Sequence, residues 1–150
     1  MNYSPKEQLE MINHQIKELV GIYQEAISCY NISGNEFWIW YALIIMDGEH
    51  TQQDICSMWS LPKQTVNTII THMVQKGLAS LEVVPGTRNR KTIHLTEAGK
   101  RYGESIVMPI FNAEQGVFEK IPMEDRIAFM SVLDKYIAIL REEINKATKK

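Results

Sequence analysis

Polar and basic side chains that could bind nucleic acid are concentrated between residues 51 and 96. This stretch has the pattern of a short helix, a turn, a second helix, and two strands joined by a basic loop. A helix with a small polar outer face can enter the major groove of DNA, and a basic loop beside it can hold phosphates. The candidate DNA-contacting residues are Thr51, Gln52, Lys63, Gln64, Thr65, Asn67, Thr68, Thr71, Arg88, Asn89, Arg90 and Lys91.

The second helix of this segment carries groups that suit base edges. Gln64 and Asn67 can each bind an adenine edge, and Lys63 can reach guanine or phosphate. The threonines at 65 and 68 can meet phosphate or a thymine methyl group. A solvated polar helix face is the ordinary alternative, and the adjacent basic loop favours the DNA interpretation.

The loop supplies the densest positive charge. We expect Arg88 to enter the minor groove while Arg90 and Lys91 hold phosphates. The chain has a net charge of −2, but residues 60–101 contain seven Lys or Arg and two Asp or Glu, which leaves +5 there and −7 elsewhere. This asymmetry is typical of a nucleic-acid-binding face on an acidic body.

Length and composition indicate one soluble domain. The 150 residues, 45% hydrophobic and 23% charged, are enough to bury a core. No apolar run is long enough to cross a membrane and no signal peptide is visible, so we expect a cytoplasmic protein. Cys29 and Cys56 are too few for a disulfide framework, which fits a reducing compartment.

The remaining pattern is helical. Ser4 and Thr51 are candidate helix caps, residues 37–46 form an almost wholly apolar helix, and Gly77 is a candidate helix terminator. Residues 81–84 and 92–95 alternate as strands, and helices are expected from Glu97 to about Ile121 and from Met123 onward. The fold class is therefore mainly α with a small β-wing.

The first and last helices carry long apolar stripes. In the first, apolar residues from Leu9 to Tyr30 recur at spacings of three and four; in the last, two stripes lie side by side. One partner would leave the second stripe exposed to water, so we expect a homodimer rather than packing on the chain's own core alone.

The order and residues of these elements resemble the MarR family of bacterial winged helix-turn-helix regulators. The likeness rests on Thr51–Ile55, Leu61–Asn67, Lys76–Leu78, Arg88–Lys91 and Ile93–Gly99. It implies a single MarR-like domain in residues 1–150, with a DNA-binding lobe at 33–99 flanked by dimerisation helices at 1–32 and 100–150. It also implies a homodimer on a pseudo-palindromic operator, and we expect a repressor of transcription.

The resemblance further implies control by a small molecule, often phenolic, or by oxidation. Tyr30, Trp38 and Tyr41 are candidate residues for a pocket that holds a flat aromatic effector, although most aromatic residues here are expected to be core. The sequence departs from the family pattern in two ways. Gly86 stands where the wing loop often begins with an acidic residue, and the recognition helix has Thr68, Thr71 and His72 where the family often has Arg or Lys.

Three alternatives are weaker. A redox sensor would use Cys29 or Cys56, yet such cysteines are more often inert. A winged-helix module for protein contacts would not need the cationic loop. An enzyme is not expected, because the four histidines are scattered and no nucleophile has an identifiable base; no metal site, catalytic site or cofactor is expected.

Overall fold

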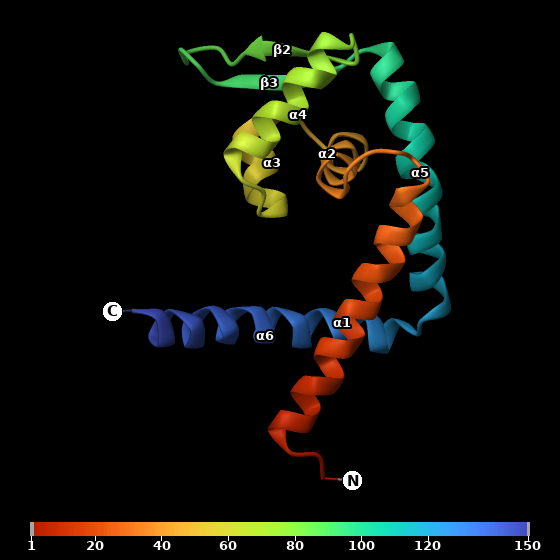
Figure 1. Ribbon diagram of the computed structural model, residues 1–150, viewed down its shortest axis with the longest axis vertical. Coiled ribbons are helices and arrows are strands. Elements are labelled where there is room, and N and C mark those ends of the chain that lie inside the picture. Colours follow the sequence, from red (N-terminus) through yellow and green to blue (C-terminus); the bar gives the residue numbers. More distant parts are fainter. Residues whose placement is uncertain (1, 150) are drawn as a thin grey trace. The chain divides into compact units, whose positions relative to one another are not determined.

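The computed structural model describes residues 2–149 and is mainly helical with one small sheet. The elements, in chain order, are α1 (Pro5–Ser28), α2 (Gly34–Ile45), β1 (His50–Thr51), α3 (Gln52–Trp59), α4 (Lys63–Gln75), β2 (Ala79–Val83), β3 (Lys91–Leu95), α5 (Glu97–Lys120) and α6 (Met123–Thr148) (Figure 1). The chain divides into two compact units, residues up to 110 and residues from 111 onward. The predicted fold class, mainly α with a small β-wing, is confirmed.

Helix starts follow the capping signals in the sequence. The Ser4 hydroxyl accepts from the Glu7 backbone N–H, and the Glu7 carboxylate accepts from the Ser4 N–H. Thr51 and Asp54 form the same reciprocal box at the start of α3. These boxes pair N–H groups that a helix start otherwise leaves without intrahelical partners.

Helix α4 ends at the expected glycine. Gly77 has φ of +73°, a left-handed conformation that glycine adopts without strain. The Leu78 N–H donates to the Met73 carbonyl, and the Gly77 N–H donates to the Val74 carbonyl. This pair of bonds is a Schellman motif, and it turns the chain from α4 into β2.

The core of the first unit lies between α2, α3, α4 and the sheet. Its fully buried side chains are Phe37, Ile39, Trp40, Ile55, Val66, Ile70, Met73 and Val107. Met58 of α3 and Val74 of α4 lie outside this core, and each is 37% exposed. Their helical spacing was compatible with burial, but Val66, Ile70 and Met73 already complete the buried stripe of α4.

The sheet has three antiparallel strands in the order β1-β3-β2. The predicted pair of strands is confirmed, and β1 is an addition that sequence reasoning missed. It pairs His50 with Ile93 and Thr51 with Thr92. A strand of two residues has no alternation to detect, so its pattern could not reveal it.

The first part of α5 packs very closely on the lobe. A Cβ at Gly99 would collide with the carbonyl oxygen of Leu78, and a Cβ at Gly103 would lie 2.8 Å from Ile44 and 2.9 Å from Trp40. These two glycines let α5 approach α2 and the turn after α4. The helix then continues through Pro109.

The second unit consists of the end of α5 and the whole of α6. No residue of α6 is buried, and its apolar side chains are exposed along its length. Among the described helices, none is both long and apolar enough to cross a membrane.

Candidate nucleic-acid interface

Helix α4 presents the predicted polar face to solvent. Lys63, Gln64, Asn67, Thr68 and Thr71 are exposed, and Thr65 is half-buried at the edge of this face. The opposite side of α4 is fixed by Val66, Ile70 and Met73 in the core, and the helix also contacts α3 and β2. Burial of one side therefore determines which side chains point outward.

Two of these threonines use their hydroxyl protons within the helix. Thr68 Oγ1 donates to the Gln64 carbonyl at 2.9 Å, and Thr71 Oγ1 donates to the Asn67 carbonyl at 2.7 Å. Each hydroxyl keeps acceptor capacity, and each side chain keeps its methyl group. In this state the pair suits thymine methyl contacts and hydrogen bonds from donors better than it suits phosphate.

The N-terminus of α4 is open. It begins after Pro62, and no side chain in the described part of the chain caps it. The first N–H groups of a helix have no partner within the helix and carry partial positive charge. They are therefore available to a phosphate oxygen beside Lys63 and Gln64.

Thr51 and Gln52 lie at the start of α3, outside α4. Thr51 is 6% exposed, and its hydroxyl accepts from the Asp54 N–H. Gln52 is half-buried in the first turn of α3. The structure thus gives Thr51 a capping role.

The wing loop begins with a tight turn. The Thr87 N–H donates to the Val84 carbonyl across Pro85 and Gly86, and Gly86 has φ of +80°. Proline followed by a glycine of positive φ is the pattern of a type II turn. Gly86 is therefore required by the backbone at the position where an acidic residue was expected.

The hairpin ends in a basic tip. The Val84 N–H donates to the Arg90 carbonyl at 2.7 Å and closes the loop, which leaves Arg88 and Asn89 at the tip. Arg88, Asn89 and Lys91 are all exposed. In Figure 1 the β2–β3 hairpin extends beyond α3 and α4 to a free end.

Arg90 forms an ion pair with Asp54 of α3. Its Nη2 lies 3.9 Å from Asp54 Oδ1, in an ion pair whose two side chains are 58% and 39% exposed. The hydrogen bond from the Thr51 backbone N–H lowers the pKa of Asp54, and the Arg90 guanidinium lowers that pKa further. Asp54 of α3 thus pairs with a wing arginine, the role expected of an acidic residue in the loop itself.

A second polar network joins the wing strands at their base. His94 Nε2 lies 3.1 Å from Glu82 Oε2, 2.9 Å from Thr92 Oγ1 and 4.0 Å from Glu49 Oε1. Sequence reasoning did not single out these residues, because they come from the segment before β1, from β2 and from β3. Only the strand pairing brings them together.

The aromatic residues expected around an effector are partly assembled. The Trp38 ring stacks on Trp59 at 5.0 Å and contacts Tyr41 at 5.3 Å and Tyr23 at 5.2 Å. Tyr30 is half-buried and has no ring contact with this cluster among the described residues. The buried Trp59 Nε1 has no hydrogen-bond partner within the same residues, so it is an available donor.

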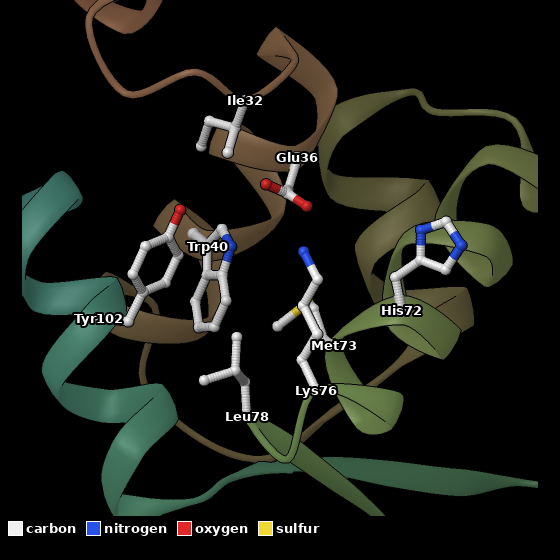
Figure 2. A pocket seen from close by; sticks show the side chains of 8 residues that line it. All are labelled: Ile32, Glu36, Trp40, His72, Met73, Lys76, Leu78 and Tyr102. Carbon is white, nitrogen blue, oxygen red and sulfur yellow. The ribbon is translucent and has the colours of Figure 1, made fainter.

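A separate cavity of about 210 Å³ lies between α2, α4 and α5. Its polar lining includes Glu36, Lys76, His72 and Tyr102, as Figure 2 shows. None of Tyr30, Trp38 and Tyr41 lines it. Sequence reasoning missed this cavity because its residues come from segments up to 70 positions apart.

Cys29 and Cys56 are both free thiols. Cys29 is exposed and its thiol donates to the Ala26 carbonyl, while Cys56 is half-buried in α3. Across residues 2–149, no group of three or more His, Cys, Asp or Glu side chains is arranged to hold a metal ion.

The chain matches known proteins by family and by fold. The MarR family model matches residues 30–88, whereas no curated protein sequence matches the chain. The MarR family regulator NMB1585 from Neisseria meningitidis has a TM-score of 0.81 at 24% identity, over 99% of this chain and 100% of that one.

Two other solved structures share the fold at lower similarity. The S. aureus MepR-DNA complex has a TM-score of 0.64 at 21% identity, over 93% of this chain and 99% of that one. Bordetella bronchiseptica BpsR, studied for regulation of its DNA binding by 6-hydroxynicotinic acid, has a TM-score of 0.64 at 20% identity, over 90% and 96%. The MarR family model thus matches the part of the chain at residues 30–88, and the shared fold extends over nearly the whole chain.

Proposed function

We propose that the protein is a sequence-specific DNA-binding transcriptional regulator. The observation that carries this proposal is the pairing of two features in one lobe. Helix α4 has an exposed polar face with an uncapped N-terminus, and the adjacent wing has an exposed basic tip. A recognition helix needs the first feature, and phosphate binding needs the second.

The two features divide the work of binding. Gln64 and Asn67 are short polar groups on the first two turns of α4, where a recognition helix reads base edges. Arg88 and Lys91 are exposed cations on the wing, and each phosphate contact they make releases counterions. We infer that α4 selects the sequence while the wing contributes much of the affinity.

The regulator acts as a homodimer on a pseudo-palindromic operator. The support is the exposed apolar surface of α1 and α6, which is too extensive for a monomer in water. Its members on α6 include Ile127, Phe129, Met130, Leu133, Ile137 and Leu140. Two-fold pairing of such surfaces would present two recognition helices to two half-sites.

The regulator represses transcription and is released by a small aromatic ligand. The support is the cluster around Trp38, Tyr41 and Trp59, where the indole N–H of Trp59 lacks a partner. A ligand with an aromatic ring and an acceptor group could insert there and satisfy that donor. BpsR, a protein of the same fold, is described as regulated in DNA binding by 6-hydroxynicotinic acid.

Two other functions have less support. A redox switch would need a reactive thiol. The Cys29 thiol donates a hydrogen bond to the Ala26 carbonyl, and Cys56 is half-buried in α3. A module for protein contacts would not require the cations at 88, 90 and 91 or the ion pair that steadies the wing.

The proposal is tested by selecting bound fragments from genomic DNA with the purified protein and sequencing them. We expect recovery of a pseudo-palindromic sequence whose half-sites lie about one helical turn apart. Recovery of fragments with no shared sequence would show that the protein does not read DNA specifically, and would favour the protein-contact function.

A further inference from the structure

The cavity between α2, α4 and α5 is separate from the aromatic cluster. Glu36 and Trp40 are one helical turn apart on α2 and line the cavity, whereas Trp38 and Tyr41 project into the aromatic cluster. The recognition helix contributes His72 and Met73, and Lys76 directly follows it. A ligand here would therefore contact the C-terminal end of α4, away from Gln64 and Asn67.

Opposite charges face each other across this cavity. In Figure 2 the Glu36 carboxylate and the Lys76 ammonium point toward the same space, and the indole nitrogen of Trp40 lies beside them. Within the described part of the chain, Glu36 and Lys76 form no ion pair within 4.0 Å. A carboxylate and an ammonium separated in this way can each bind a complementary charge on one small molecule.

The negative charge of Glu36 acts on the Tyr102 phenol, which also lines the cavity. Burial raises the pKa of the Tyr102 phenol, and the Glu36 carboxylate raises that pKa further. Tyr102 therefore keeps its proton at neutral pH and offers a hydrogen-bond donor at the cavity wall. A ligand that is only an anion would be repelled by Glu36, and a ligand that is only a cation would be repelled by Lys76.

Apart from His72, the rest of the lining is apolar, and the volume of the cavity limits the size of the ligand. Met73, Leu78 and the ring of Trp40 form part of the wall. The volume of about 210 Å³ is below the range of about 300–1,000 Å³ that drug-sized ligands occupy. This combination fits one short apolar group attached to a centre with both charges.

We propose that this cavity binds a free apolar α-amino acid. Its carboxylate pairs with Lys76, its ammonium pairs with Glu36, and its side chain packs on Met73 and Leu78. Binding of the amino acid does not rest on the proposed DNA-binding function.

Calorimetric titration of the DNA-free protein tests the proposal. The probes are L-leucine, L-methionine and L-phenylalanine, together with two leucine analogues that each lack one charge. These are 4-methylpentanoate, without the amine, and 3-methylbutylamine, without the carboxylate. We expect saturable binding of at least one of the three amino acids. If leucine binds, each of its two analogues should bind at least tenfold more weakly than leucine, because each charge-assisted hydrogen bond is worth about 1.5–3 kcal/mol.

Variants then locate the site. Glu36→Gln and Lys76→Met should each weaken amino-acid binding by about tenfold or more, whereas Glu104→Gln, which removes an exposed carboxylate from α5, should bind as the parent does. Thermal unfolding of each variant without ligand checks that it is folded. If no probe amino acid binds the parent, or if the binding survives both cavity substitutions, the proposal is wrong.

A DNA measurement separates the two proposals. If the amino acid binds but the selected operator is not bound, the cavity assignment stands and the regulatory function fails. If the operator is bound but the amino acid is not, the cavity assignment fails alone.

Discussion

Arg90 Nη2 lies 3.9 Å from Asp54 Oδ1, and this contact joins the wing to the start of α3. Asp54 also accepts a 2.8 Å hydrogen bond from the Thr51 backbone N–H in the capping box. One carboxylate therefore steadies both the helix that supports α4 and the loop that carries the wing cations.

Replacing this carboxylate should cost stability. We expect Asp54→Ala to lower the free energy of unfolding by about 1 kcal/mol, since loss of a capping interaction typically costs about 0.5–2 kcal/mol. Urea denaturation followed by circular dichroism measures the change. Gln53→Ala, at the exposed neighbouring position, is the control; equal midpoints for the two variants would mean that the box contributes little.

The same carboxylate predicts a dependence of stability on pH. Hydrogen bonding to Thr51 holds the pKa of Asp54 below its usual value, which is about 3.9 in unfolded chains. The stabilisation is therefore complete above that pH and is lost as pH falls through the lower folded pKa. Because the side chain is 39% exposed, solvent screening keeps the effect small.

We expect the parent to be more stable than Asp54→Asn at about pH 6, with the difference shrinking below about pH 4. Denaturation midpoints of both proteins across this range provide the measurement. A difference that grew toward acid pH would have the wrong sign for a carboxylate with a lowered pKa.

If α4 is the recognition helix, substitutions on its polar face should reduce the preference for the operator over other DNA sequences. Gln64→Ala or Asn67→Ala should weaken binding to the selected operator by about 1–3 kcal/mol, which is the range for a good contact to a base edge. Binding to a scrambled duplex should hardly change. Fluorescence anisotropy with both duplexes measures this, with Gln75→Ala in the last turn of α4 as the control. Parallel losses on both duplexes would indicate backbone contacts instead.

The wing assignment predicts a change in salt dependence. Arg88→Ala should reduce the slope of log affinity against log salt by about one unit for each half-site contact removed. Lys17→Ala removes an exposed cation from α1 and should leave the slope unchanged. An Arg88→Ala protein that binds the operator as tightly as the parent at physiological salt would contradict the assignment.

The exposed apolar faces predict a dimer that charge can disrupt. Leu133 and Ile137 are one turn apart on α6 and are 43% and 45% exposed. We expect Leu133→Glu/Ile137→Glu to halve the mass seen by sedimentation, because burying carboxylates in an interface is costly. Lys135→Gln, on the same helix, is the control. A parent protein that sediments as a monomer would refute the dimer directly.

The sequence predicted elements best where a local signal determines them. The capping boxes at Ser4 and Thr51, the terminator Gly77 and the strands around the wing all depend on near neighbours. In α4, apolar spacing alone cannot tell that Val74 stays 37% exposed while Val66, Ile70 and Met73 are buried. That outcome depends on how much neighbouring structure is available to cover the helix.

The parts that sequence reasoning missed depend on tertiary contacts. Strand β1 forms because His50 and Thr51 pair with Ile93 and Thr92 of β3. The partner of Arg90 is Asp54, 36 positions earlier, and no spacing rule links the two. The division into a lobe at 33–99 and dimerisation helices at 1–32 and 100–150 remains a prediction, as do the individual DNA contacts.

Affinity for the selected operator and for a scrambled duplex, each measured at two salt concentrations, tests the central claim most directly. We predict that the parent binds the operator about a thousandfold or more tightly than the scrambled duplex. Affinity for both duplexes should fall as salt rises. Equal affinities for the two duplexes, or binding that salt does not weaken, would contradict a regulator that reads sequence with α4 and holds phosphates with its wing.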